Sequence, residues 1–174
     1  MMTMAKGLTS GYIPMSGVMV GDRVANRFIA DGGEFYHGFT YSGHPVAAAV
    51  ALANLDIIEG EGLIERVRED TGPYLGEALA PLADHPLVGE VRTYGLLAAI
   101  ELVKSKDGPV LFENVGHAGG LCRDHALSNG LMMRAVRDGM ILSPSLTYTR
   151  DDIDATVAIA KTALDATAAD LGIS

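Results

Sequence analysis

The second half of the chain alternates between segments with the apolar pattern of β-strands and segments with helical spacing. The expected elements are strands over 91–103, 131–136 and 140–142, and helices over 113–128 and from Thr149 onward. Gly95 interrupts the first strand as an irregularity, and Asp152 lies three residues after Thr149, as in a capping box. Along the second half of the chain these segments follow one another as strand, helix, strand and helix.

The first half of the chain contains one long helix preceded by loops and short elements. The expected elements are a loop over 7–16, a buried strand over 16–20, helical turns over 23–30 and an aperiodic loop over 34–43. Pro45 suits the first turn of a helix, and the Ala-rich run from it to Glu59 favours that helix. Gly60 and Gly62 indicate a bend, and Gly72-Pro73 indicates a kink in the helical segment that follows.

The charge and the apolar runs exclude several classes of partner. The net charge is −9, from 13 basic and 22 acidic residues, which disfavours nucleic acid and anionic membranes. The longest apolar run, Val46–Leu52, is too short to cross a bilayer. No secretory leader is recognisable at the start, and the single cysteine, Cys122, fits a reducing compartment. We therefore expect a cytoplasmic protein with no nucleic-acid or membrane partner.

Lys6 is the first candidate for a chemical role. It lies between Ala5 and Gly7 and is followed by a turn of small residues that includes Ser10 and Gly11. A lysine amine presented in a cavity can form a Schiff base with an aldehyde when desolvation or a cationic neighbour lowers its pKa. On the residues alone, a solvated lysine near a flexible terminus is the more common case, because most lysines are exposed.

A second segment gives Lys6 a context. Residues 37–45 read His-Gly-Phe-Thr-Tyr-Ser-Gly-His-Pro, and this run and the lysine segment together resemble the class III, fold-type-I aminotransferases, which use pyridoxal 5′-phosphate (PLP). The resemblance is closest to the branch that transfers amino groups from ω-amino acids or amines to pyruvate. It implies an α/β fold of that type, in which this chain is the C-terminal portion. It also implies a division into the end of the large PLP-binding domain with a fragment of its sheet (1–44), an interdomain helix (45–75) and a small α+β C-terminal domain (76–174).

The resemblance also assigns roles to four residues. Lys6 matches the lysine that forms the Schiff base with PLP and then moves the proton. Thr40 matches a threonine that reaches across a homodimer to the cofactor phosphate, and Phe39 matches a residue beside the same site. Arg134 matches an arginine that binds the substrate carboxylate. Taken alone, Thr40 could instead stabilise a turn, Phe39 could pack in a core, and Arg134 could form an ion pair or lie exposed at an edge.

The implied reaction uses an amino donor and a keto-acid acceptor, but the residues leave two alternatives open. PLP-dependent aminomutases, racemases and decarboxylases share this fold and cofactor. The chain could also be a non-catalytic remnant, since the family's phosphate-binding turn, stacking aromatic and pyridine-nitrogen aspartate precede the lysine and have no counterpart in these residues. For the same reason we expect the isolated chain to be inactive.

A metal site is not expected. His117, Cys122 and His125 are close in sequence, but their spacing matches no closed zinc pattern. Their more ordinary interpretation is packing or surface positions on a helix.

Overall fold

The computed structural model describes residues 1–32, 34–108 and 110–174, and it divides into two compact units, Met1–Gly62 and Leu63–Ser174. Each unit is described by itself. The division into 1–44, 45–75 and 76–174 stays a prediction. Within the described part of the chain, no helix is both long enough and apolar enough to cross a bilayer.

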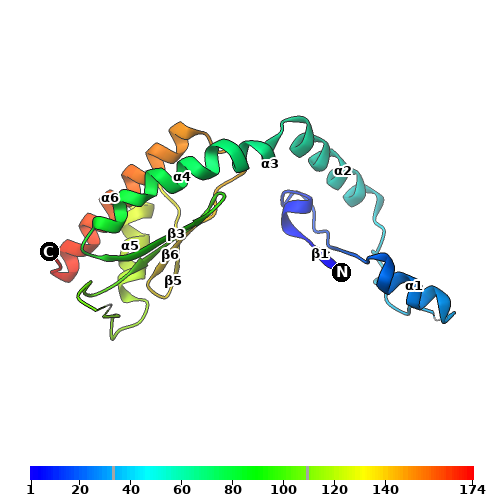
Figure 1. Ribbon diagram of the computed structural model, residues 1–174, viewed down its shortest axis with the longest axis horizontal. Coiled ribbons are helices and arrows are strands. Elements are labelled where there is room, and N and C mark those ends of the chain that lie inside the picture. Colours follow the sequence, from blue (N-terminus) through cyan, green and yellow to red (C-terminus); the bar gives the residue numbers. More distant parts are fainter. Residues whose placement is uncertain (33, 109) are drawn as a thin grey trace. The chain divides into compact units, whose positions relative to one another are not determined.

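The first unit holds a two-stranded sheet, a short helical turn and two α-helices (Figure 1). In order these are β1 (Met2–Met4), the 3-10 helix η1 (Lys6–Leu8), β2 (Gly17–Met19), α1 (Asp22–Ala30) and α2 (Pro45–Gly60). Strand β2 pairs antiparallel with β1, with Thr3 opposite Val18. The strand expected over 16–20 is therefore present, but its expected burial is wrong: Val18 and Met19 are each 58% exposed. In the described residues β2 pairs with β1 alone, and a two-stranded sheet leaves both faces accessible.

Helix α2 begins where the sequence predicts, with Pro45 in its first turn and the His44 ring accepting a hydrogen bond from the Ala47 N–H. It ends at the expected bend, where Gly62 has a φ of +59°. Only Ala47 and Ala51 are buried along the helix. Its larger apolar side chains, Leu52 among them, remain exposed, so the first unit has little core of its own.

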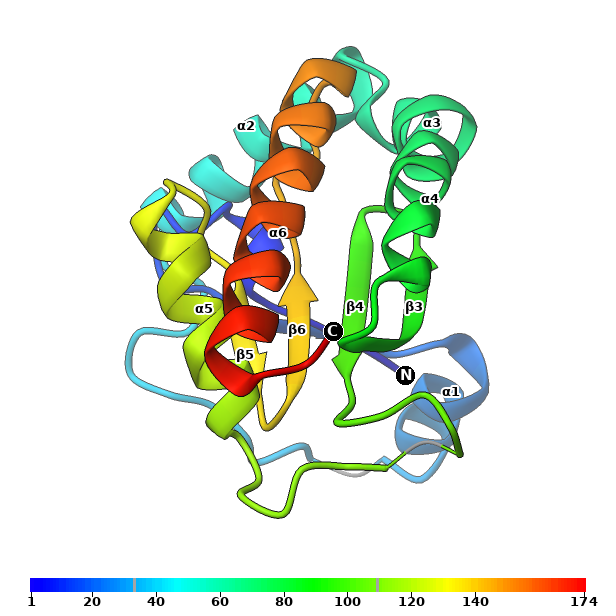
Figure 2. The same cartoon turned by 90° about the vertical axis from the view of Figure 1, so that its left-hand side faces the viewer.

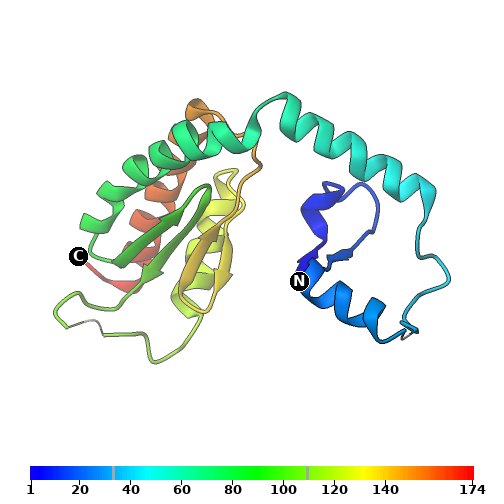
Figure 3. The ribbon, with the colours of Figure 1, turned by 45° about the vertical axis from the view of Figure 1, so that its right-hand side comes forward.

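The second unit is a four-stranded antiparallel sheet with helices against one face (Figure 2). Its elements are α3 (Leu63–Arg66), the π-helix η2 (Val67–Thr71), α4 (Gly72–Leu79), η3 (Ala80–Asp84), β3 (Val88–Tyr94), β4 (Leu97–Leu102), α5 (His117–Ser128), β5 (Arg134–Val136), β6 (Gly139–Leu142) and α6 (Arg150–Leu171). The strand order is β3-β4-β6-β5, so β5 is an edge strand. Figure 3 shows the same helical layer over the sheet from another side.

Alternation along the central strands explains the two faces of this sheet. On β4, Ile100 and Leu102 are fully buried while Glu101 between them is partly exposed. Because side chains on a strand point alternately to opposite faces, the buried set faces the helices. Leu79 on α4 and Leu164 on α6 belong to the same fully buried core. The opposite sheet face carries the polar and partly exposed residues.

Two features of this unit differ from the sequence-based expectations. The strand expected over 91–103 is a hairpin of β3 and β4, and Gly95 lies in its turn with a φ of +56°. The helix expected from 113 begins only at His117, because Gly116 has a φ of +89°, which ends helical geometry on its N-terminal side.

A π-helical turn, η2, lies directly before Gly72-Pro73, where the sequence predicts a kink, and a Cβ on Gly72 would lie 2.4 Å from the Val67 carbonyl oxygen. The kink itself stays a prediction. The capping box of Thr149 and Asp152 starts α6 as expected, with both reciprocal hydrogen bonds present.

Candidate active site

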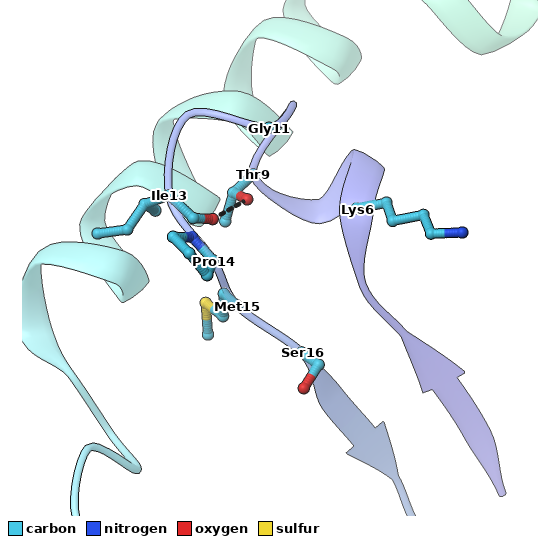
Figure 4. A pocket seen from close by; sticks show the side chains of 7 residues that line it. All are labelled: Lys6, Thr9, Gly11, Ile13, Pro14, Met15 and Ser16. Atoms are coloured by element: carbon cyan, nitrogen blue, oxygen red, sulfur yellow. Dashed lines mark hydrogen bonds between the residues drawn. The ribbon is translucent and has the colours of Figure 1, made fainter.

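Lys6 lies on η1, where the chain turns sharply between β1 and a loop. Its backbone has a φ of +48°, a left-handed conformation that side chains with a Cβ rarely adopt. Its side chain is exposed and borders a hollow of about 490 Å³. The hollow is lined by Lys6, Thr9, Gly11, Ile13, Pro14, Met15 and Ser16. In Figure 4 the Lys6 side chain extends away from the other lining side chains, so its amine is accessible from solvent.

Two side chains hold the turn that carries Lys6. The Thr9 hydroxyl, buried at 1% exposure, donates to the Ile13 carbonyl at 2.6 Å and closes the loop (Figure 4). From α2, the Asn54 amide donates to the Gly7 carbonyl at 2.9 Å and to the Leu8 carbonyl at 3.2 Å. The lysine is therefore placed by contacts that reach across 46 and 47 residues of sequence.

Phe39 and Thr40 lie in an exposed turn before α2. The Phe39 N–H donates to the Ser42 hydroxyl at 3.0 Å, and the Ser42 N–H donates back to the Phe39 carbonyl at 2.9 Å. Phe39 is 77% exposed, so it does not pack in a core in this structure. Its ring meets the His37 ring edge-on, with centroids 5.6 Å apart. Thr40 itself is exposed.

Arg134 is the first residue of the edge strand β5 and is exposed. It pairs with Ile141, which in turn lies in register with Ala99 and Arg92 across the sheet. Arg92 forms ion pairs with Glu90 and Glu101. Unlike Arg92, Arg134 forms no ion pair within the described residues.

The structure therefore brings Lys6, Phe39 and Thr40 into the first unit and places Arg134 in the second. Sequence reasoning missed Asn54, and also Asp138, which is 8% exposed and binds the start of α5. The one sequence feature that could have indicated a role for Asn54 was a side-chain amide inside an Ala-rich helix. For Asp138, the signal was its place in a turn directly after the strand that carries Arg134.

The residues considered for a metal occupy separate structural roles. The His125 ring and the Asp170 carboxylate form a pair at 2.7 Å. Cys122 is fully buried, and burial raises the pKa of its thiol to about 11. His117 is exposed at the first position of α5. Over residues 1–32, 34–108 and 110–174, no three His, Cys, Asp or Glu side chains are grouped so as to hold a metal ion.

Comparison with known proteins relates the chain to one enzyme family. The sequence model of class-III aminotransferases matches residues 1–164. The chain belongs to this family. It is 55% identical over 169 residues to the putrescine–pyruvate aminotransferase of Pseudomonas aeruginosa. The aligned region covers 97% of this chain and 37% of that protein. The chain thus spans well under half the length of the relatives it matches.

Solved structures show the same relationship. A transaminase solved with L-alanine is 39% identical with a TM-score of 0.89, over 97% of this chain and 40% of the other. An (S)-enantioselective ω-transaminase from Thermomicrobium roseum is 40% identical with a TM-score of 0.88, over 95% of this chain and 37% of the other. The fold class predicted from the sequence, the α/β fold of fold-type-I transaminases, is confirmed.

Proposed function

We propose that the whole protein to which these residues belong is a PLP-dependent transaminase. In this reaction an amino group passes from an amine or ω-amino acid to pyruvate or a similar keto acid. The observation that carries the proposal is the 55% identity to a putrescine–pyruvate aminotransferase over 97% of this chain. We further propose that the protein works as a homodimer, because Thr40 is assigned to a cofactor held by the neighbouring subunit. We also propose that it is cytoplasmic.

The residues around Lys6 fit an aldehyde cofactor in two respects. Lys6 is exposed, and it is one of the residues that line a hollow of about 490 Å³, which is within the range of cofactor-binding clefts. PLP, when bound, supplies an electron sink that weakens the bonds at the substrate carbon carrying the amine. Lys6 supplies the point of attachment and, once released by substrate, a basic nitrogen that holds and moves the proton.

The turn at residues 39–42 provides hydrogen-bond donors for an anion. Its backbone is fixed by the reciprocal Phe39 and Ser42 hydrogen bonds, and Thr40 between them is exposed. A hydroxyl and a nearby backbone N–H in such a turn are suitable partners for phosphate oxygens. This supports the assignment of Thr40 to the cofactor phosphate of the neighbouring subunit, with Phe39 beside that site.

Arg134 is assigned to the substrate carboxylate. Its guanidinium is exposed and has no carboxylate partner among the described residues, whereas Arg92 in the same cross-strand row is neutralised by two glutamates. A guanidinium binds a carboxylate through two parallel hydrogen bonds. Arg134 thus distinguishes pyruvate and ω-amino acids from amines that have no carboxylate.

Reductive labelling tests the assignment of Lys6. The purified protein is mixed with PLP, reduced with borohydride and digested, and the modified lysine is found by peptide mass. We expect the label on Lys6, its loss in Lys6→Ala, and no change in the matched control Lys161→Ala. Labelling spread evenly over Lys104, Lys106 and Lys161 contradicts a specific lysine.

A second assay tests the reaction. Whole protein is incubated with pyruvate and putrescine or β-alanine, and alanine is measured. Alanine formed with matching loss of donor supports transfer. A racemase leaves these achiral donors unchanged, and an aminomutase or a decarboxylase could change β-alanine without forming alanine from pyruvate. The absence of alanine with both donors therefore contradicts the proposal.

A further inference from the structure

The turn between β5 and β6 connects the strand that carries Arg134 to the rest of the second unit. The strands pair as Arg134–Ile141, Ala135–Met140 and Val136–Gly139, which leaves Arg137 and Asp138 as the two turn residues. Strand β5 has three residues and β6 as its one neighbour in the sheet. The position of Arg134 therefore depends on how this hairpin is held.

The residues of this turn do not by themselves favour its backbone conformation. Arg137 has a φ of +55°, at a position where two-residue hairpins favour glycine, asparagine or aspartate. A backbone conformation of this kind persists only when the surroundings enforce it. The surroundings of Asp138 supply that enforcement.

Asp138 binds two other elements at once. One carboxylate oxygen accepts from the Gly116 N–H at 2.8 Å and the other from the Gly119 N–H at 3.0 Å, both at the start of α5. Its backbone carbonyl accepts from the Leu102 N–H of β4 at 2.9 Å. The first N–H groups of a helix have no partner within the helix and favour a negative charge. The buried carboxylate of Asp138 accepts hydrogen bonds from two of these N–H groups and supplies the negative charge.

The packing of α5 on the turn is close and depends on glycine. A Cβ on Gly119 would lie 2.1 Å from the Arg137 carbonyl oxygen, so any side chain there would force helix and turn apart. The helix therefore sits directly against the turn, and Asp138 joins them by hydrogen bonds. The hairpin has little freedom to move relative to the helix while these contacts persist.

We propose that Asp138 is a positioning residue for Arg134: by joining the β5–β6 turn to the start of α5 and to β4, it fixes where the guanidinium is offered to the substrate carboxylate. This inference rests on the proposed role of Arg134. Asp138 itself touches neither substrate nor cofactor. Its effect is on the affinity for substrates that carry a carboxylate.

Kinetics of the whole protein test the proposal. Asp138→Asn keeps the side-chain shape but only one acceptor oxygen, so one of its two hydrogen bonds to α5 is lost. We expect KM for pyruvate to rise on the order of tenfold, with little change in KM for putrescine, which has no carboxylate. The double variant with Arg134→Ala should be no worse than Arg134→Ala alone, because both changes act through one guanidinium.

A matched control and a readout independent of activity separate positioning from general damage. Asp152→Asn weakens the N-terminal cap of α6, whose reciprocal hydrogen bonds lie between Thr149 and Asp152, and should leave KM for pyruvate unchanged. Hydrogen exchange at the β5 amides should accelerate in Asp138→Asn and not in Asp152→Asn. Adding Arg137→Gly relieves the left-handed strain, so it should restore part of the lost affinity and of the slow exchange, and it provides a foldable background if Asp138→Asn alone unfolds.

Two results overturn the proposal: one refutes the role of Asp138, and the other refutes the role of Arg134. If Arg134→Ala raises KM for pyruvate but Asp138→Asn changes neither KM nor β5 exchange, Asp138 does not position Arg134. If Arg134→Ala leaves KM for pyruvate unchanged, the assigned role of Arg134 fails and the inference fails with it, even where exchange shows that Asp138 holds the hairpin.

Discussion

Replacing Asn54 by alanine should loosen the turn that carries Lys6. The Asn54 amide donates to the carbonyls of Gly7 and Leu8, directly after the lysine. Alanine removes both donors and leaves α2 intact, because alanine has the highest helix propensity. The change therefore acts on the turn and not on the helix.

The magnitude follows from two opposing terms. A net hydrogen bond contributes about 0.5–1.5 kcal/mol, and because this contact is partly exposed, the pair contributes about 1–2 kcal/mol. The left-handed backbone of Lys6, with a φ of +48°, costs about 1–2 kcal/mol. The two terms are of equal size, so without Asn54 the turn loses what offsets its strain. A change of about 1.4 kcal/mol raises the population of opened turn about tenfold.

Hydrogen exchange measures this population directly. The amides of Leu8, Thr9 and Ser10 donate within the turn, at 3.1, 3.2 and 3.3 Å, and should exchange about tenfold faster in Asn54→Ala. PLP labelling of Lys6 after reduction should fall in parallel. The matched control is Asn26→Ala, an exposed asparagine on α1.

The reasoning is refuted if Thr9 exchanges at the same rate in the parent, Asn54→Ala and Asn26→Ala proteins. It is also refuted if Asn26→Ala accelerates exchange as much as Asn54→Ala does. In the first case the turn is stable without the amide. In the second, the effect is a general loosening of the first unit.

Three further predictions concern the stability of the chain. Leu79→Ala, at a fully buried core position, should lower the free energy of unfolding by about 2–5 kcal/mol in urea denaturation. Hydrogen bonds from Lys161 to Asp165, and from the Thr149 backbone to Asp152, lower the pKa of each carboxyl. A carboxyl whose pKa is lower in the folded than in the unfolded protein stabilises the fold at pH values above its unfolded pKa, and this stabilisation is lost as the pH falls. The urea midpoint should therefore fall as pH drops below about 4, and it should fall less in Asp165→Asn. Limited proteolysis should remove residues 1–40 first, because only two apolar side chains, both alanines, are buried among the described residues of the first unit; earlier cleavage within α4 or α6 contradicts this.

Features encoded by neighbouring residues were predictable from the sequence. Thr149 and Asp152 form their capping box through atoms three residues apart, and Pro45 starts α2 through its own ring geometry. The hairpin turn at Gly95 was not recognised, because the apolar run on both sides resembles one continuous strand. Its length was the available signal, since strands of thirteen residues exceed the usual range.

The contacts that place the candidate site could not be predicted in this way. Asn54 meets the Lys6 turn across 46 and 47 residues, and Asp138 meets α5 across 19 and 22. Neither spacing has a local pattern, because the partners are brought together only when a helix packs on a loop or on a hairpin. The residue types that carry chemistry were recognisable from their motifs, whereas the residues that hold them required the fold.

The turn that carries Lys6 and the turn next to Arg134 are held in the same way. Lys6 and Arg137 are two of the three residues other than glycine that have a positive φ in the described chain, and each lies in a turn bound by a buried or partly buried polar side chain. A strained turn held by side-chain contacts has one favoured position, while an unstrained loop has many. If the strain is part of how Lys6 is positioned, then Lys6→Gly should stabilise the turn while removing the amine. Slower exchange at Thr9 in Lys6→Gly than in Lys6→Ala would demonstrate that strain, and equal rates in the two variants would show that the left-handed turn costs nothing here.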